Sequence, residues 1–281
     1  MRLTWLAALL AAAGCAGLPG HAPRLDGISY SRMESVAADV PQAIHVLKID
    51  LTRPGIELEV TAGDSSAGRA YRAQTTSEFL VRTHVQAAVN GSFFDPFKSG
   101  GPGGEDYYPK SGDPVDALGL SMHAGRVVSP PNGDPKINGT LCIRKPASVT
   151  IERGQRCPPG TDEAIAAGPL LLSGGAAQSH TYSMTARHPR TAFGLSADRK
   201  TAWMVVVDGR QPLSSMGATL PDMAEIFRRL GAADALNLDG GGSTAMVVAG
   251  DAGPQVLNTP IHTGVPGRER PSANQLGVRA K

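Results

Sequence analysis

The chain alternates short apolar runs with turn residues over most of its length, which is the pattern of a strand-rich fold. Residues 45–51 and 56–60 alternate apolar and polar positions on either side of Pro54-Gly55, so we predict a hairpin there. Residues 118–122 and 126–129 predict a second hairpin in the same way.

Two segments carry helix signals. Residues 75–84 predict a short helix, and residues 220–230 predict a longer one. Thr219 and Asp222 have the spacing of a capping box before the second helix, and Gly231 lies where a helix commonly ends.

Three apolar runs, at 86–89, 202–207 and 235–238, predict buried strands. The last two enclose the longer predicted helix, which gives strand–helix–strand over 202–238. No internal repeat and no linker follow residue 40. We therefore predict an α+β fold, a single mixed-sheet domain with a few helices.

The N-terminus has the features of a targeting signal. Arg2 precedes an apolar stretch, 3–14, that is too short to span a bilayer, and Cys15 follows small residues as in the lipobox of bacterial lipoproteins. We predict a signal peptide over 1–15, a tether over 16–40 and a catalytic domain over 41–281. The protein would cross the inner membrane and be periplasmic or anchored to the outer membrane, with Cys15 its membrane attachment. A plain secretory signal with an incidental cysteine is the alternative.

Composition supports a globular domain and excludes one class of partner. Of 281 residues, 41% are hydrophobic and 19% are charged, while 34 glycines and 22 prolines indicate many loops. Removal of residues 1–14 would take away only Arg2 among the charged residues, so the mature chain would be nearly neutral. Because no basic stripe with interleaved aromatics is present, we expect no nucleic-acid partner.

The remaining cysteines, Cys142 and Cys157, are close in sequence. In an oxidising envelope they could close a short disulfide loop, or they could stay as two thiols.

Polar residues gather at the ends of strand-like runs: Asn90, Asp208 and Asp239 follow such runs, and Arg190 precedes one. Asn90 begins Asn-Gly-Ser-Phe-Phe-Asp, Arg190 lies in His-Pro-Arg-Thr-Ala-Phe-Gly, and Asp208 begins Asp-Gly-Arg-Gln. Asp239 lies in Asn-Leu-Asp-Gly-Gly-Gly-Ser, whose glycines suit a close approach of backbone to a ligand. The long Gly- and Pro-rich segment 95–117 is of a kind that often lines a site.

Taken in this order, these segments resemble the phosphodiester glycosidase family. That family includes the animal enzyme that removes N-acetylglucosamine from mannose 6-phosphate on lysosomal proteins. The resemblance covers roughly residues 45–279 and is tightest across 190–246. It implies one pocket formed by Asn90, Arg190, Asp208, Asp239, Gly240, Gly241 and Ser243. His188 is left out of this set, and segment 95–117 shows no match to the animal enzyme.

Cleavage of a sugar–phosphate bond develops positive charge on the sugar and negative charge on the phosphate. We assign Asp239 to the anomeric carbon as nucleophile, base or electrostatic partner, and Asp208 as second carboxylate. Arg190 would bind the phosphate with backbone amides of Gly240, Gly241 and Gly242, while Asn90 and Ser243 orient sugar hydroxyls. The expected substrate is a glycan or glycolipid phosphodiester, and we expect no cofactor.

Two alternatives remain open. Asp95, Asp208 and Asp239 could hold a divalent cation, structural or catalytic, and make the protein a metal-dependent phosphodiesterase. The same polar residues could instead serve a lipoprotein that binds an envelope glycan without cutting it.

Overall fold

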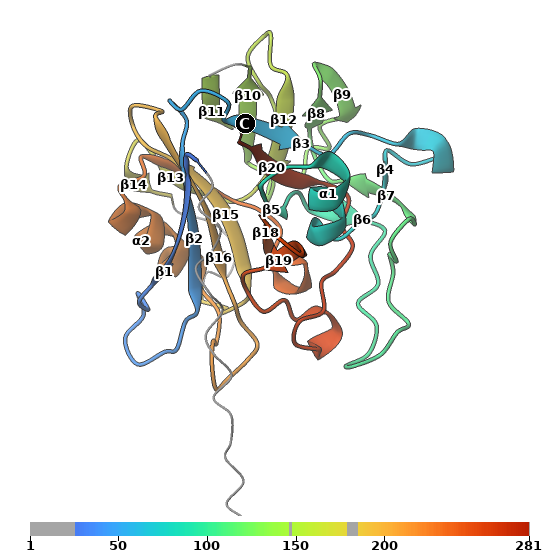
Figure 1. Cartoon of the computed structure of the whole chain (residues 1–281), viewed down its shortest axis with the longest axis vertical. Coiled ribbons are helices and arrows are strands. Elements are labelled where there is room, and N and C mark those ends of the chain that lie inside the picture. Colours follow the sequence, from blue (N-terminus) through green and yellow to red (C-terminus); the bar gives the residue numbers. More distant parts are fainter. Residues whose placement is uncertain (1–25, 146–147, 179–184, 281) are drawn as a thin grey trace, which may run out of the picture.

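The computed structural model (Figure 1) describes residues 26–145, 148–178 and 185–280, and these form one mostly β domain with two α-helices. The described strands build four sheets. Every ladder between them is antiparallel, whereas the sequence predicted a mixed sheet with a few helices. Within the described ranges, no helix is long and apolar enough to cross a membrane.

Seven strands form the largest sheet, in the order β1 (Ile28–Met33), β2 (Ile44–Asp50), β16 (Thr201–Val207), β15 (Arg190–Leu195), β17 (Asp234–Asn237), β13 (Leu170–Ser173) and β14 (Ala176–Ala177). A five-stranded sheet has the order β11 (Ser148–Arg153), β10 (Gly139–Arg144), β12 (Glu163–Ala167), β8 (Ser121–His123) and β9 (Arg126–Ser129). A second five-stranded sheet has the order β19 (Gly253–Val256), β18 (Met246–Gly250), β5 (Ala87–Asn90), β20 (Gln275–Arg279) and β3 (Glu57–Val60). The smallest contains β4 (Tyr71–Arg72), β7 (Pro114–Ala117) and β6 (Phe94–Asp95).

Helix α2 (Leu220–Leu230) covers the outer face of the seven-stranded sheet, beside β13, β15 and β17 (Figure 1). Its predicted boundaries are confirmed: Thr219 and Asp222 form a capping box, and Gly231 ends the helix at φ 86°. Its apolar face is buried, and a Cβ at Gly194 of β15 would overlap the Phe227 ring. Glycine in β15 therefore allows the helix to lie close to the sheet.

The short helix predicted over 75–84 is present as α1 (Thr76–Thr83). It packs on β5 and β18 of the second five-stranded sheet, with Phe79 and Leu80 buried. The main core fills the space between the large sheet and the two five-stranded sheets. It contains side chains from all three, among them Ile49, Val89, Leu141, Phe193 and Met246. Three 3₁₀ turns complete the described elements: η1 (Ser65–Ala67), η2 (Gly241–Ser243) and η3 (His262–Gly264).

The hairpin predicted over 45–60 is wrong, although both of its strands exist. β2 pairs with β1 and β16, whereas β3 pairs with β20 in a different sheet. Alternating polarity fixes which face of a strand is buried, but it does not fix the neighbouring strand.

The predicted tether, 16–40, is too long at its C-terminal end. Residues 28–33 form β1, whose six residues pair with β2, so this part of the segment belongs to the domain. The signal peptide and Cys15 lie outside the described residues. Cys142 and Cys157 are joined in a disulfide with a Cα–Cα distance of 5.7 Å, which ties β10 to the segment after β11.

Candidate active site

The site is built where the ends of four strands meet. β15 runs antiparallel to both of its neighbours, so its first residue, Arg190, pairs with Val207 at the end of β16. On its other side, Ala192 pairs with Asn237 at the end of β17. The Asp239 amide donates to the Gly91 carbonyl at 2.9 Å, which brings the end of β5 to the same place. All four polar segments predicted from the sequence therefore come together.

Asn90 is buried and uses its side chain to hold this junction. Its Nδ2 donates to the Asp239 carbonyl at 2.7 Å, while its Oδ1 accepts from the Thr191 hydroxyl at 2.7 Å and the Ala245 amide at 3.2 Å. These bonds engage both ends of the amide. Asn90 thus positions Asp239 and the glycine turn after it.

Asp239 stands at the start of that turn with part of its surface exposed. Its Oδ1 accepts from the Gly240 amide at 2.8 Å. Burial raises the pKa of Asp239, against the charges of Arg270 and Arg210 and hydrogen bonding from Ser243 and Gly240, which lower it. The carboxyl group is therefore partly desolvated and feels the charges of two guanidinium groups.

Arg270 is the main cation beside it. Its Nη1 donates to the Ser243 hydroxyl at 3.2 Å, and any Cβ at position 242 would collide with its guanidinium. Burial lowers the pKa of Arg270, while the Asp239 charge raises it. Because residue 242 has no side chain, the Arg270 guanidinium can lie against the turn that follows Asp239.

His262 positions Arg270 through a hydrogen bond. It is fully buried, and its Nδ1 accepts from Arg270 Nε at 3.1 Å. Burial, followed by the charge of Arg270, lowers the pKa of His262 to about 4, so the ring is neutral near neutral pH. Because Arg Nε can only donate, the His262 proton is assigned to Nε2.

Arg210 provides a second guanidinium at the turn. It is exposed, has a backbone φ of 59°, and its Nη2 would lie 3.0 Å from a Cβ at position 241. Gly241 itself has φ +61°, so glycine meets both the close approach and the backbone conformation. Arg210 also acts on His188: burial, followed by the charges of Arg190 and Arg210, lowers the pKa of His188.

The segment 95–117 packs against these groups. The Tyr107 ring meets His262 edge to face at 4.3 Å, and Lys110 Nζ lies 3.3 Å from the Tyr107 centroid. The Phe97 ring lies 4.4 Å from the Arg270 guanidinium carbon. The Gly103 amide donates to the Thr263 carbonyl at 2.6 Å and joins this segment to η3.

Asp208 has a different environment from Asp239. Its oxygens accept from Asn258 Nδ2 at 2.9 Å and from the Thr259 amide at 3.0 and 3.1 Å, and His45 Nε2 lies 3.3 Å away. It is 5% exposed. The predicted second carboxylate therefore has its oxygens engaged by protein donors that hold segment 258–259.

Arg190 is directed toward backbone. Its Nε donates to the Ala218 carbonyl at 3.2 Å and Nη2 to the Ala186 carbonyl at 3.3 Å. Two amides predicted to bind phosphate are also engaged, since Gly240 donates to Asp239 and Gly241 donates to the Pro189 carbonyl at 2.8 Å.

Sequence reasoning missed Arg270, Arg210 and His262. Arg210 directly follows Asp208-Gly209, so the motif that was recognised contained a signal for it. Arg270 and His262 come from a loop without periodicity, and only the folded chain brings them to the glycine turn. Within the described part of the chain, no three His, Cys, Asp or Glu residues form a group that could hold a metal ion.

Comparisons with known proteins agree with the motifs. A model of the phosphodiester glycosidase family matches residues 83–279. A SPbeta prophage-derived uncharacterized protein, YomE of Bacillus subtilis (strain 168), is 41% identical over 75 residues, which are 26% of this chain and 11% of that protein. The chain thus matches only a small part of the length of this relative.

Two solved structures share the fold. A hypothetical protein from Synechocystis superposes with a TM-score of 0.63 at 16% identity, over 92% of this chain and 64% of that one. The catalytic domain of zebrafish N-acetylglucosamine-1-phosphodiester alpha-N-acetylglucosaminidase, auto-inhibited by its pro-peptide, gives 0.63 at 18% identity, over 93% and 85%. The family match spans residues 83–279, which is well over half of the chain, so the chain belongs to the phosphodiester glycosidase family.

Proposed function

We propose that this protein is a hydrolase that cleaves the sugar–phosphate bond of a glycosyl-1-phosphodiester in the bacterial envelope. One observation carries the proposal: the Asp239 carboxylate accepts from the first amide of a glycine turn, and the next two glycines of that turn lie against the guanidinium groups of Arg210 and Arg270. This arrangement offers a negative group to one half of a substrate and positive groups to the other.

The charges match those that develop in the reaction. As the bond between the anomeric carbon and the phosphate oxygen breaks, its electron pair leaves with the phosphate and the sugar becomes cationic. The departing phosphomonoester has a second pKa of about 6, so it is a good leaving group near neutral pH. Fixed guanidinium groups stabilise its charge in two-pronged hydrogen bonds, and water finally supplies hydroxyl to the sugar.

The proposed roles follow from the contacts. Asp239 faces the anomeric carbon, and Arg270 with Arg210 binds the phosphate. Ser243, which already accepts from Arg270, orients a sugar hydroxyl or the phosphate. In this proposal Asn90 and Asp208 are positioning residues.

Arg190 and Gly242 complete the proposed site. Arg190 supports the backbone that carries His188, because His188 forms a bridge with the residue, Ala218, whose carbonyl accepts from Arg190. Gly242 leaves room for Arg270 and contributes no side chain.

We further propose an envelope location, with export directed by residues 1–15 and attachment through Cys15. The disulfide between Cys142 and Cys157 supports an oxidising compartment.

The test is hydrolysis of a panel of sugar-1-phosphodiesters in heavy-oxygen water, with and without a chelator. Cleavage at the anomeric carbon places the label in the free sugar and releases unlabelled phosphomonoester. The Asp239→Asn variant should lose this activity, and chelator should leave it unchanged.

Other outcomes would replace the proposal. Label in the phosphate, with sugar-1-phosphate as product and loss of activity in chelator, identifies a metal-dependent phosphodiesterase. Saturable binding of the diesters without turnover identifies a glycan-binding lipoprotein.

A further inference from the structure

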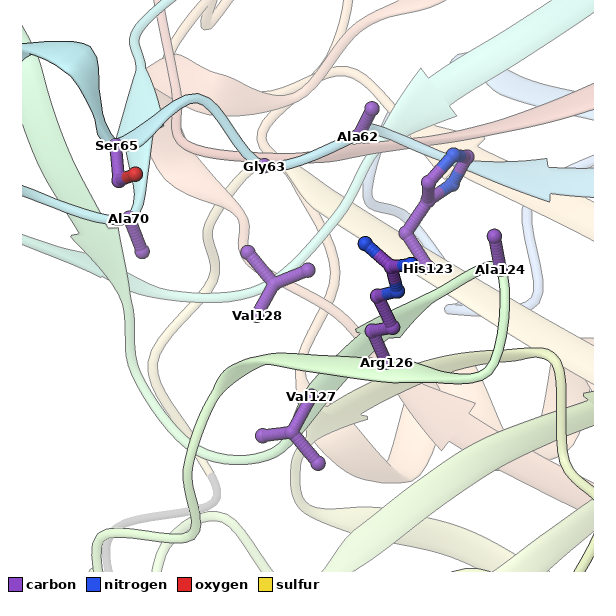
Figure 2. Close-up of a pocket in the computed structure, with 9 residues that line it drawn as sticks. All are labelled: Ala62, Gly63, Ser65, Ala70, His123, Ala124, Arg126, Val127 and Val128. Atoms are coloured by element: carbon purple, nitrogen blue, oxygen red, sulfur yellow. The ribbon is translucent and has the colours of Figure 1, made fainter.

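A pocket away from the Asp239 site lies between the β8–β9 hairpin and the chain that leads from β3 to β4 (Figure 2). Its volume is about 510 Å³, and it is lined by Ala62, Gly63, Ser65, Ala70, His123, Ala124, Arg126, Val127 and Val128. None of these residues belongs to the Asp239 site, so this pocket needs an explanation of its own.

Two basic side chains share one face of the hairpin. His123 and Arg126 are direct cross-strand partners, and such partners project to the same side of a sheet. Figure 2 shows the imidazole and the guanidinium rising together from the hairpin toward Ala62 and Gly63. Like charges at directly opposed positions are unfavourable unless an anion lies between them.

His123 carries positive charge over a wider pH range than a free histidine. Its Nδ1 lies 3.1 Å from Oε2 of the buried Glu163 and 2.9 Å from the Val60 carbonyl. The hydrogen bond to Glu163 raises the pKa of His123, with burial acting against it and Glu59 adding to it. Both contacts use Nδ1, which leaves Nε2 for a ligand.

Glu163 does not neutralise Arg126. Its oxygens already face His123, Lys145 Nζ at 3.2 Å and the amides of Val60 and Ala124 at 3.4 Å each. Over the described residues, Arg126 has neither an ion pair nor a hydrogen bond, and none of the residues that line the pocket is acidic. Arg126 therefore leaves the pocket with an unmatched positive charge.

The walls beside these cations are small and apolar. Ala62, Ala70 and Val128 line one part of the pocket, and Val127 is 57% exposed at its edge. Gly63 allows this close packing, because a Cβ there would lie 2.6 Å from Val128 Cγ1. An apolar wall suits the C–H face of a sugar ring, and a guanidinium suits a phosphate or carboxylate.

We propose that this pocket is a binding site for a sugar unit that bears a negative group, either phosphate or carboxylate. Arg126 binds the anion through paired hydrogen bonds, His123 Nε2 donates a further one, and the sugar ring packs on Val128 and Ala62. The site binds its ligand independently of catalysis at Asp239, so it stands or falls separately from the proposed activity.

The experiment is a titration of the isotope-labelled protein, observed by NMR, with glucose 6-phosphate, glucuronate and neutral glucose at matched ionic strength. Signals from the backbone of 123–128 and from the His123 ring should shift saturably with one or both anionic sugars, and the pKa of His123 should rise in the complex. The phosphate and carboxylate arms identify which anion the site prefers.

Arg126→Gln should weaken this binding about tenfold, the effect of a lost charged hydrogen bond. The matched control is Arg82→Gln, which changes an exposed arginine on α1, away from the pocket. This variant should bind as the wild type does. The proposal is overturned if glucose shifts these signals equally, if Arg126→Gln binds unchanged, or if no probe moves them.

Discussion

Asp208 and Asp239 arise from the same local pattern, yet they end in opposite environments. Each follows an apolar strand and precedes glycine, and the two strands flank β15 on either side. Asp208 accepts hydrogen bonds from Asn258 and Thr259, with His45 close by. Asp239 instead accepts from the Gly240 amide and the Ser243 hydroxyl, with the guanidinium groups of Arg270 and Arg210 nearby.

The difference lies in what the folded chain brings to each carboxylate. Segment 258–259 supplies Asp208 with fixed donors that leave little capacity for a substrate. Segment 262–270 supplies Asp239 with the charge of Arg270, whose guanidinium is positioned by hydrogen bonds to His262 and Ser243. A carboxylate with satisfied oxygens stabilises structure, whereas one that is desolvated and incompletely bonded is available for chemistry.

The largest effect that tests this contrast is on activity. Asp239→Asn should lower kcat/KM on the order of a thousandfold, about 4 kcal/mol, because the group facing the anomeric carbon loses its charge. Steady-state release of free sugar measures it, and circular dichroism checks the fold. Activity within a few-fold of wild type in a folded variant would remove Asp239 from the reaction.

Asp208→Ala should mainly lower stability. It removes the acceptor of the part-buried Thr259 N–H and one of the two acceptors of the buried Asn258 amide, which keeps the Thr244 carbonyl, and this costs about 2–4 kcal/mol. Urea unfolding at neutral pH measures the loss, with Asp208→Asn as a milder control that keeps one acceptor oxygen. If Asp208→Ala kept its unfolding midpoint but lost activity as fully as Asp239→Asn, Asp208 would be a catalytic carboxylate.

The sequence identified both carboxylates and gave each a part in the reaction, but it could not show the hydrogen bonds that engage Asp208. Helix α2 was predictable to the residue because its signals are local: Thr219, Asp222 and Gly231 act on their own helix ends. The hairpin over 45–60 failed because strand pairing is decided by distant residues, β16 for one strand and β20 for the other.

The same limit applies to the site. The three glycines at 240–242 predicted that another group lies close to this backbone. Which groups these are, Arg270 and Arg210, is decided by tertiary packing. The motif named Arg190 as the phosphate ligand because it precedes a strand at the right place. Its bonds to the Ala218 and Ala186 carbonyls depend on neighbouring loops that no local pattern describes.

Exchanging these arginines for lysine would sharpen the comparison. Arg270→Lys should reduce kcat/KM about ten- to a hundredfold, because lysine cannot form the paired contacts of a guanidinium. Arg190→Lys should change it less than about threefold and act on stability instead, through its backbone bonds. Kinetics with one diester substrate compares the two variants. A larger loss of kcat/KM in Arg190→Lys than in Arg270→Lys would make Arg190 the phosphate ligand.

The pH profile tests the electrostatics of Asp239. Since burial raises its pKa, the acid limb of kcat/KM should lie above the usual range of an aspartate, about 4. The Arg270 charge lowers that pKa, so Arg270→Gln should move the limb to higher pH while Arg190→Gln leaves it nearly in place. An acid limb that is unchanged in Arg270→Gln would show that another group governs it.

The smallest effect is on the stability of the unliganded protein. A carboxyl whose pKa is raised on folding opposes the folded state when ionised, so the penalty is absent below the unfolded pKa and complete above the folded pKa. Asp239→Asn removes the charge and should stabilise the protein at neutral pH by about 1 kcal/mol, as at other active sites that trade stability for function. Urea unfolding midpoints at neutral pH and below the usual pKa of aspartate measure this gain, which should vanish at the lower pH.

Asp208→Asn is the control. It should not stabilise the protein at either pH, because fixed donors stabilise the Asp208 oxygens. If Asp208→Asn did raise the unfolding midpoint, Asp208 would be destabilised in the folded protein as Asp239 is, and the contrast between the two carboxylates would fail.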